Sequence, residues 1–374
     1  MMRVARVASD MAEGLDYAGS GVDIDLEGNA VGALVGALSR SVRKPGTPGA
    51  PVDLPGGFGG LVEFGDNYLA LATDGVGSKL SIATKLNQWA GVGIDCMAMN
   101  VNDLLCVGAE PIAFVDYIAV PKPDPEVHAA LGASLAEACR RARVTLAGGE
   151  TASLPGIVTE LDLSGTALGW LAKGSEITGA NLKNGDVLIG MPASGVHSNG
   201  YSLVRNVVSH CGASWEDAAP FDVDESRIER FVEGSVTLGE VFLNPTRIYC
   251  DPVVDLIQDG PCDSSLIDGI CHVTGGGLSN LLRLHDSLGW HIDSPLPILP
   301  EFNWIQQEGN VTDREMHRTF NMGCGMIIAV DSSVADEVCS WLAQRMEGCA
   351  IIGQVVDNGH KVTHSNPDVV FEHY

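Results

Sequence analysis

The chain has 374 residues, of which 45% are hydrophobic and 19% are charged. This length exceeds what one hydrophobic core usually serves, so two domains are expected, and the charged content is too low for a disordered chain. The formal net charge of −26 excludes nucleic acid and anionic membranes as expected partners, because binding either one requires a basic surface.

The cysteines and the apolar runs predict a cytoplasmic protein. Ten cysteines are scattered without a Cys-x-x-Cys pair, which is typical of reduced thiols rather than of zinc sites or disulfide frameworks. The N-terminus lacks the apolar core of a signal peptide. The longest apolar runs, such as residues 325–330, have the length of strands and are too short to span a membrane.

Apolar spacing predicts the elements of the first half. A helix is expected over residues 24–42, followed by a proline- and glycine-rich loop or linker at 44–60. Further along we expect strands at 61–64 and 68–73, helices at 79–89 and 94–107, a strand at 112–119, a helix at 125–143, and strands at 144–147 and 161–171. Since helices and strands do not alternate strictly, α+β layers are favoured over a Rossmann sheet.

A polar, turn-rich segment at 173–186 separates the two halves. We therefore expect domains at 1–172 and 173–374. The second half begins with a strand at 187–191 and contains a strand at 270–273, a Gly-Gly-Gly turn and a helix at 278–284. Both halves hold strand, glycine-turn and helix units, but no repeat can be aligned between them.

The run Thr73-Asp-Gly-Val-Gly-Ser-Lys79 follows an apolar strand and precedes a helix. Gly75 and Gly77 let the backbone approach a ligand, and the N–H groups that open the helix can bind phosphate. Asp74 would repel phosphate unless it held a cation, so Mg²⁺ is the simplest resolution. Neither the Walker pattern nor G-x-G-x-x-G is present. These residues alone leave a plain turn with an exposed aspartate equally open.

The predicted helix at 94–107 also carries polar residues. Asp95 and Asn102 are seven positions apart and share one face, with Asp103 beside Asn102. Such a pair next to a buried stripe can reach a metal from a rigid element. A solvated polar face is the alternative, and for this helix in isolation it is the favoured one.

The third acid follows a short strand in Gly148-Gly-Glu-Thr151. Glu150 comes directly after the glycines, and Thr151 could cap a helix or bind phosphate, although a plain turn is the alternative. Three acids beside small residues, Asp74, Asp103 and Glu150, predict one shared Mg²⁺–phosphate site more readily than three coincidences.

In the second half, His197 precedes Ser198 and Asn199, which are both helix-capping residues. A histidine exposed by such a turn can bind phosphate or transfer a proton, and a capping turn without chemistry is the alternative. His272 is followed by Gly275, Gly276 and Gly277. Three glycines that open a helix form an anion cradle.

Two arginines and one loop complete the candidates. Arg247 and Arg318 are among few cations in an acidic chain, so each could clamp a phosphate; a surface salt bridge is the alternative. The loop at 55–60 carries Gly56, Gly57 and Gly59 around one aromatic residue. It could close over nucleotide phosphates, or it could be only a linker.

Together these runs resemble the phosphoribosylformylglycinamidine cyclo-ligase, or AIR synthetase, family. The matching segments, in the order of the family, are 21–25, 56–59, 73–80, 93–95, 102–103, 148–151, 197–203, 245–249, 274–277 and 320–321. The combination is specific, although no single segment is. They cover nearly the whole chain.

The resemblance implies an α+β protomer with two AIR synthetase-like domains, the second a mixed α/β layer. It also implies a homodimer whose first domains, which bind ATP and Mg²⁺, pair their sheets into a barrel. The implied reaction converts formylglycinamidine ribonucleotide and ATP to aminoimidazole ribonucleotide, ADP and phosphate. It would proceed through an iminophosphate, so positioning and charge stabilisation would supply most of the catalysis.

The resemblance assigns residues to roles. Asp74, Asp103 and Glu150 would hold Mg²⁺, and Asp74, Asp103 and His197 would be catalytic. The nucleotide and phosphate contacts would be Gly56, Gly57, Gly59, Gly75, Gly77, Ser78, Lys79, Asn102, Thr151, Asn199, Arg247, His272, Gly275, Gly276 and Gly277. Ser153 and Leu154 stand where many members have Glu-Met, so no acid role is carried over to them.

Three alternatives compete with this family. Selenophosphate synthetase expects a reactive cysteine or selenocysteine in the early glycine loop, and residues 56–60 contain neither. Thiamine-phosphate kinase lacks the run that begins at His197. A non-catalytic ATP-binding scaffold is the alternative from another class, and the intact acids argue against it.

Overall fold

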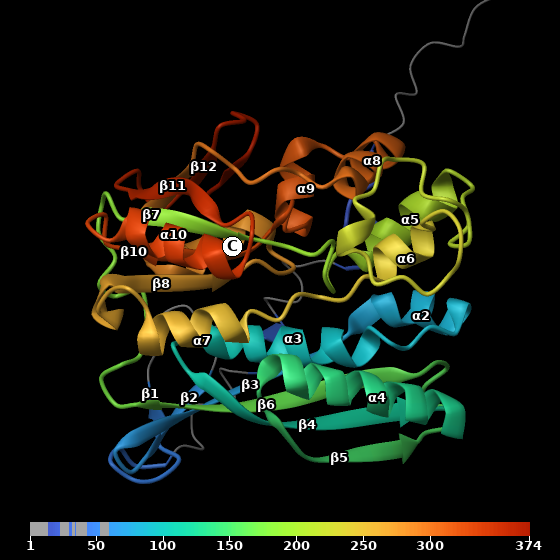
Figure 1. Cartoon of the computed structure of the whole chain (residues 1–374), viewed down its shortest axis with the longest axis horizontal. Coiled ribbons are helices and arrows are strands. Elements are labelled where there is room, and N and C mark those ends of the chain that lie inside the picture. Colours follow the sequence, from blue (N-terminus) through green and yellow to red (C-terminus); the bar gives the residue numbers. More distant parts are fainter. Residues whose placement is uncertain (1–13, 23–29, 32–33, 35–42, 53–59) are drawn as a thin grey trace, which may run out of the picture.

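The computed structural model describes residues 14–22, 30–31, 34, 43–52 and 60–374. Figure 1 shows a sheet at the bottom, a layer of helices above it, and a second sheet with its own helices at the top. The expected helix at 24–42 and the glycines Gly56, Gly57 and Gly59 fall largely or wholly outside the described residues.

Among the described residues, the first sheet has the strand order β1-β2-β3-β6-β4-β5. Its strands are β1 (Pro51–Val52), β2 (Gly60–Phe64), β3 (Asn67–Gly75), β4 (Glu110–Val120), β5 (Thr145–Ser153) and β6 (Asp162–Ala172). β4 and β5 are parallel, and the other neighbours are antiparallel. In β6, alternate residues from Leu163 to Leu171 are buried while those between them are more open. One face of the sheet is therefore covered and the other is not.

Two helices from the first half, α3 (Val92–Leu105) and α4 (Pro125–Ala142), cover one face of this sheet (Figure 1). The 3₁₀ turn η1 (Gly77–Lys79) and α2 (Leu80–Leu86) precede them and contact the helices at 201–210 and 238–243 of the second half. α4 begins where the Asp124 side chain accepts the N–H groups of Glu126 and Val127, with Pro125 in the first turn. It ends at Arg143, which has a left-handed φ of 58°.

The second sheet, as far as the structure describes it, has the order β13-β12-β9-β11-β7-β10-β8. Its strands are β7 (Val187–Pro192), β8 (Ile267–His272), β9 (Gly289–Ile292), β10 (Cys324–Val330), β11 (Ala350–Val356), β12 (Val362–His364) and β13 (Val370–Phe371). Its helices are α5 (Tyr201–His210), η2 (Glu225–Arg227), α6 (Leu238–Leu243), α7 (Cys250–Asp259), η3 (Ser264–Leu266), η4 (Gly277–Leu284), α8 (Pro300–Gly309), α9 (Asp313–Thr319) and α10 (Ala335–Arg345).

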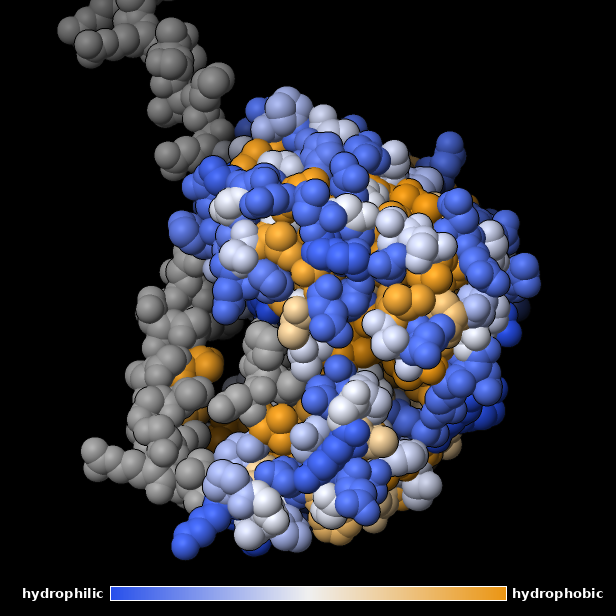
Figure 2. Space-filling model, turned by 90° about the vertical axis from the view of Figure 1, so that its left-hand side faces the viewer, coloured by the Kyte–Doolittle hydropathy of each residue, from blue (hydrophilic) through white to orange (hydrophobic). Residues whose placement is uncertain are grey.

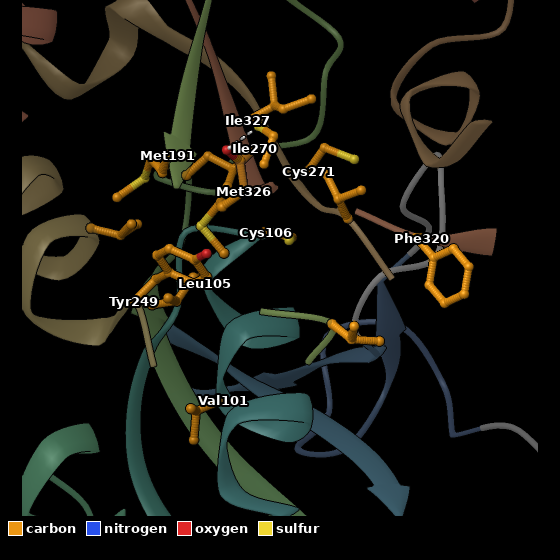
Figure 3. Packing of buried hydrophobic residues seen from close by; sticks show 14 of the residues in the cluster. Val101, Leu105, Cys106, Met191, Tyr249, Ile270, Cys271, Phe320, Met326 and Ile327 are labelled. Atoms are coloured by element: carbon orange, nitrogen blue, oxygen red, sulfur yellow. Dashed lines mark hydrogen bonds between the residues drawn. The ribbon is translucent and has the colours of Figure 1, made fainter. Parts of the chain in front are cut away.

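Helix α3 joins the two halves. It packs on the first sheet through β3 and β6 and also contacts β8 and α7 of the second half. Figure 3 draws Val101 and Leu105 of α3 in the same buried cluster as Tyr249 and Met326 of the second half. Buried apolar residues of both halves form one continuous cluster. The two halves therefore share a core along α3.

One sequence prediction was wrong in local detail. The glycines and Glu150, expected in a turn, lie inside β5, because pairing with β4 extends that strand to Ser153. The helix predicted at 278–284 was confirmed, and it is a 3₁₀ helix from Gly277 to Leu284. The other elements predicted in the described part of the first half were confirmed to within a few residues at each end.

All ten cysteines are free thiols in the structure. No helix within the described ranges is long and apolar enough to cross a bilayer. On the face drawn in Figure 2, hydrophilic residues predominate and hydrophobic ones gather in smaller patches.

Close packing on the covered face of the first sheet requires a glycine at position 165. A Cβ at Gly165 in β6 would overlap the ring of Phe114 in β4, whereas Gly132 on the exposed side of α4 has open space around it. We expect Gly165→Ala to lower the free energy of unfolding by about 1–3 kcal/mol through overpacking. Gly132→Ala, the control, should raise it by about 0.5–1 kcal/mol through helix propensity. Urea denaturation measures both, and equal effects of the two substitutions would contradict the packing argument.

Candidate active site

Two carboxylates of the first half lie close together, one at the end of a strand and one on a helix. Asp74 is the next-to-last residue of β3, and Asp103 lies in the last turn of α3. Asn100, also on α3, donates from Nδ2 to the Asp74 carbonyl oxygen at 3.2 Å, which ties the helix to the strand end. We call Asp74 and Asp103 the acid pair.

Among the residues that the structure describes, no Lys or Arg forms an ion pair with Asp74 or Asp103. Surrounding protein atoms raise the pKa of Asp74 to about 6 by desolvation, although solvent reaches its side chain. The N–H of Gly75 acts in the opposite direction, and the negative charge of Asp103 raises the pKa of Asp74 further. A divalent cation between the two carboxylates would relieve both desolvation and repulsion, so these residues fit Mg²⁺.

No group of three His, Cys, Asp or Glu side chains converges on a metal position in the parts of the chain that the structure describes. Mg²⁺ often binds proteins through only one or two carboxylates, with water and substrate phosphates as its other ligands. Two acids are therefore a sufficient protein contribution for a magnesium–phosphate site.

His272 at the end of β8 connects the acid pair to the second half. Its Nδ1 lies 2.9 Å from Oδ1 of Asp103, and its Nε2 lies 3.4 Å from Nδ2 of Asn102. The amide nitrogen Nδ2 of Asn102 can only donate, so Nε2 of His272 accepts. The proton of the ring is therefore on Nδ1, which donates to Asp103. This arrangement fixes the orientation of the Asp103 carboxylate.

Asn102 itself is fully occupied by protein partners. Its Nδ2 donates to the Arg247 carbonyl oxygen at 2.9 Å, and its Oδ1 accepts the Tyr249 N–H at 3.0 Å. The prediction that Asp95 and Asn102 share one face of α3 is confirmed, but that face is buried against residues 244–249. Asn102 therefore holds the second half in place instead of facing a ligand.

Lys79 is completely buried. Its Nζ donates to Asp95 Oδ1 at 2.8 Å, to the His197 carbonyl oxygen at 3.0 Å and to the Asn244 carbonyl oxygen at 2.8 Å. Burial lowers the pKa of Lys79 and raises that of Asp95, and the attraction between the two opposes both shifts. Since all three ammonium donors are taken, the expected phosphate contact of Lys79 does not fit this structure.

His197 is also buried, contrary to the expectation of an exposed capping turn. Its Nε2 accepts the Ser194 N–H at 3.2 Å, and its Nδ1 has no partner among the described residues. Burial lowers the pKa of His197 well below its usual value, so the ring is neutral. Helix α5 is preceded by Gly200, with φ of 76° and no side-chain cap, so the predicted Ser198 or Asn199 cap is wrong.

The glycine turns of the two halves differ in their surroundings. Gly77 has φ of 70°, a conformation that favours glycine, and opens the 3₁₀ turn in which Ser78 Oγ lies 3.4 Å from Ser202 Oγ. In the second half, Asn199 lies beside Gly275, and the ring of Tyr374 lies over Gly276. Gly275 is thus the glycine of this turn that lies next to Asn199.

The structure does not bring Glu150 to the acid pair. In sheet register, Asp74 lies opposite Gly165, Gly165 opposite Asp116, and Asp116 opposite Gly149. Side chains alternate along a strand, so Glu150 points to the open face whereas Asp74 points to the covered one. Thr151 follows on the same edge strand, three strand positions away from β3.

Family comparisons agree with this architecture. The model described as "AIR synthase related protein, N-terminal domain" matches residues 57–171, and the corresponding C-terminal domain model matches residues 183–365. A protein of Methanococcoides burtonii named phosphoribosylformylglycinamidine cyclo-ligase is 42% identical over 93% of this chain and 97% of its own length. The chain belongs to the phosphoribosylformylglycinamidine cyclo-ligase family.

Another cyclo-ligase of this name, from Methanocaldococcus jannaschii, is 42% identical over 92% of this chain and 95% of its own length. Among solved structures, "Hydrogenase Maturation Protein HypE in complex with ATP" is similar with a TM-score of 0.54 and 17% identity, over 88% of this chain and 90% of that one. At that identity the likeness shows the fold alone.

Two residues of this cyclo-ligase family member escaped the sequence reasoning. Thr246 binds Asp95 Oδ1 through both its N–H and its Oγ1, each at 2.7 Å. Asp116 shares the covered face of the first sheet with Asp74. The signal for Asp116 was an acid inside an apolar strand, and Thr246 lay in the Asn-Pro-Thr-Arg run that drew attention only for Arg247.

Removing the buried ammonium group of Lys79 should destabilise the fold. We expect Lys79→Met to lower the free energy of unfolding by about 3–5 kcal/mol, because it leaves the buried carboxylate of Asp95 without a counter-charge. The double variant Lys79→Met/Asp95→Asn should be less destabilised than Lys79→Met alone. Urea denaturation of the three proteins gives the coupling, and a loss below about 1 kcal/mol in Lys79→Met would be typical of a surface pair and contradict the assignment.

Proposed function

We propose that the protein catalyses ATP-dependent ring closure of formylglycinamidine ribonucleotide to aminoimidazole ribonucleotide, with release of ADP and phosphate. The observation that carries this proposal is the acid pair, held by the α3–His272 contacts in a chain that is 42% identical to named cyclo-ligases. A small-molecule reaction in the cytoplasm accords with the acidic composition.

Asp74 and Asp103 would hold Mg²⁺, which would neutralise the phosphates of ATP and stabilise charge that develops during phosphoryl transfer. His272 orients Asp103 through its Nδ1–H, and Asn102 orients His272 in turn. Because these side chains come from α3 and β8, two elements of one shared core, their relative positions are held rigidly.

The phosphate-binding surface would come from the glycine turns. The backbone at Gly75, Gly77 and Ser78 lies next to Asp74, and Gly275–Gly277 with Asn199 would form the facing wall. The neutral, buried His197 would act by position: its carbonyl oxygen binds Lys79 and its ring packs edge-on against Tyr249, 6.4 Å between centroids. His197 would not transfer a proton in this reaction, because its ring is buried and its pKa is lowered.

We also propose that the open face of the first sheet pairs with a second copy. Its exposed apolar residues lie on neighbouring strands at positions that share the uncovered face: Leu71, Val115, Tyr117 and Trp170. An apolar sheet face of this kind is rarely left in water. Glu150 projects to the same face, so a dimer would place it at the interface, away from the acid pair of its own chain.

The reaction is tested with purified enzyme by measuring ADP and aminoimidazole ribonucleotide together. We expect Asp74→Asn to reduce turnover by at least about 100-fold, since it removes a Mg²⁺ ligand while conserving shape. Asp66→Asn, in the surface turn between β2 and β3, serves as the control and should match the wild type. Near-normal turnover in Asp74→Asn would refute the acid pair, and ADP formation without the imidazole product would indicate a sister activity.

The dimer is tested by light scattering after size-exclusion chromatography. Trp170→Glu introduces a charge on the open face and should convert a dimer to a monomer, because burying an unpaired carboxylate is unfavourable. Ile157→Glu changes a residue that is 78% exposed outside the sheet and should leave the mass unchanged. A wild-type protein that runs as a monomer would disprove the pairing.

A further inference from the structure

Residues 370–374 form a short strap beside the second sheet. Its strand β13 pairs with β12, and Phe371 is buried with the Arg314 guanidinium 5.3 Å from the centre of its ring. After the strand, Glu372 forms an ion pair with Lys361 at 2.6 Å. These contacts fix the path of the strap as far as Glu372, and the fold thereby sets the place of the side chains that follow.

The strap carries the ring of Tyr374 to the glycine turn at 275–277. A Cβ on Gly276 would lie 2.7 Å from Cε2 of Tyr374, so the ring is in close contact with the glycine backbone. The guanidinium of Arg283 on η4 lies 5.0 Å from the centre of the same ring, a distance typical of a cation–π contact. Tyr374 therefore bridges the turn and the helix that follows it.

Buried side chains of η4 hold the same turn from within. Ser279 Oγ donates to the Gly276 carbonyl oxygen at 2.7 Å, and Asn280 Oδ1 accepts the Thr274 N–H at 3.2 Å. Both side chains are almost completely excluded from water. The direction in which a Cβ would project from Gly276 faces Ser279, Asn280 and the Tyr374 ring together. The ring thus closes this arrangement from the outside.

Asn199 lies against a different glycine of the turn. A Cβ on Gly275 would lie 3.2 Å from Oδ1 of Asn199, and the Tyr374 ring is not among its nearest neighbours. The ring therefore supports the turn from the side of η4. Gly275 and Asn199, which would form the ligand-binding wall, are left uncovered by it.

The turn also holds donors that the protein does not use. The Gly277 N–H donates to the Thr274 carbonyl oxygen at 2.9 Å, whereas the N–H groups of Gly275 and Gly276 have no hydrogen-bond partner among the residues that the structure describes. Gly276 is buried and Gly275 is partly exposed. Successive backbone N–H groups without a protein partner are suited to an anion, provided that the turn keeps its shape.

We propose that Tyr374 is a positioning residue for the phosphate-binding wall. Its ring holds the glycine turn in the shape in which the Gly275 and Gly276 N–H groups bind a phosphate oxygen. This inference rests on the function proposed above for the turn. The contacts are made by the ring and not by the hydroxyl group, because Cε2 meets Gly276 and the ring faces Arg283. Phenylalanine should therefore replace tyrosine at this position, and alanine should not.

The order of the turn is measured by amide hydrogen exchange with full-length protein. In Tyr374→Ala we expect severalfold faster exchange of the bonded N–H groups of Thr274, Gly277 and Ser279, because loss of the ring lets the turn open more often. Tyr374→Phe should exchange as the wild type does. Exchange in Tyr374→Ala equal to that of the wild type would overturn the proposal.

His373→Ala is the matched control. His373 is the exposed neighbour of Tyr374 in the strap and is not among the nearest atoms to any glycine of the turn. Its removal should leave both exchange and kinetics unchanged. An equal effect of His373→Ala would show that the strap as a whole matters and the Tyr374 ring does not, which would also overturn the proposal.

Steady-state kinetics separate positioning from a structural role. Tyr374→Ala should raise the KM of a phosphate-bearing substrate by roughly threefold to tenfold, the range of one aromatic contact, with kcat nearly unchanged and Tyr374→Phe restoring the KM. Whichever substrate responds, ATP or formylglycinamidine ribonucleotide, is the one whose phosphate the turn holds. Faster exchange with both KM values unchanged would leave only a structural contact and overturn the proposal.

The exchange measurement does not use the reaction, so the two proposals fail separately. A wild type that forms no aminoimidazole ribonucleotide, with faster exchange in Tyr374→Ala, would refute the proposed function and retain the contact of Tyr374 with the turn. A wild type that is active, with unchanged exchange in Tyr374→Ala, would refute the positioning role alone.

Discussion

The buried contact between Lys79 and Asp95 is the constraint on which the arrangement of the molecule depends. It brings the start of α2, the face of α3 and the loop of residues 244–246 to one point with no exposure to water. A charge in that position is tolerated only when it is paired and hydrogen-bonded. The contact therefore fixes how the second half sits on α3.

The functional geometry follows from that placement. With the 244–249 loop seated on α3, Asn102 receives the Tyr249 N–H and reaches His272, and His272 reaches Asp103. Asp103 in turn stands beside Asp74 at the end of β3. A chain of neutral and ionic hydrogen bonds thus connects the domain contact to the acid pair. Arg247, in the same loop, lines a polar cavity between α4, the start of α7 and loops of the second half.

Because the net charge of the chain is −26, the positions of its few Lys and Arg side chains determine where an anion can bind. Lys79 is paired with Asp95 inside the core. Arg140, Arg141 and Arg227 are also paired with acids. In the proposed reaction, phosphate binding would therefore depend on a metal held by the acid pair and on the N–H groups of helix and turn ends. The acidic surface contributes solubility but opposes anions everywhere else.

Local patterns in the sequence were sufficient for the helices and strands of the first sheet, because apolar periodicity and turn residues act over a few positions. They were also sufficient to select Asp74, Asp103 and His272, which the structure brings together. They could not place Glu150, since its direction depends on strand register with β4, a long-range property. The length of β5 was missed for the same reason.

The sequence by itself determined the family, the order of the elements and the acids available for a metal, because these depend on residue identity along the chain. Only the tertiary structure decided which polar groups are free. Lys79, His197 and Asn102 have the chemistry of site residues, but folding buries them and occupies their donors. Arg247 has the same chemistry and keeps its guanidinium open to the cavity. Burial and partner choice arise between segments far apart in sequence, so no local pattern records them.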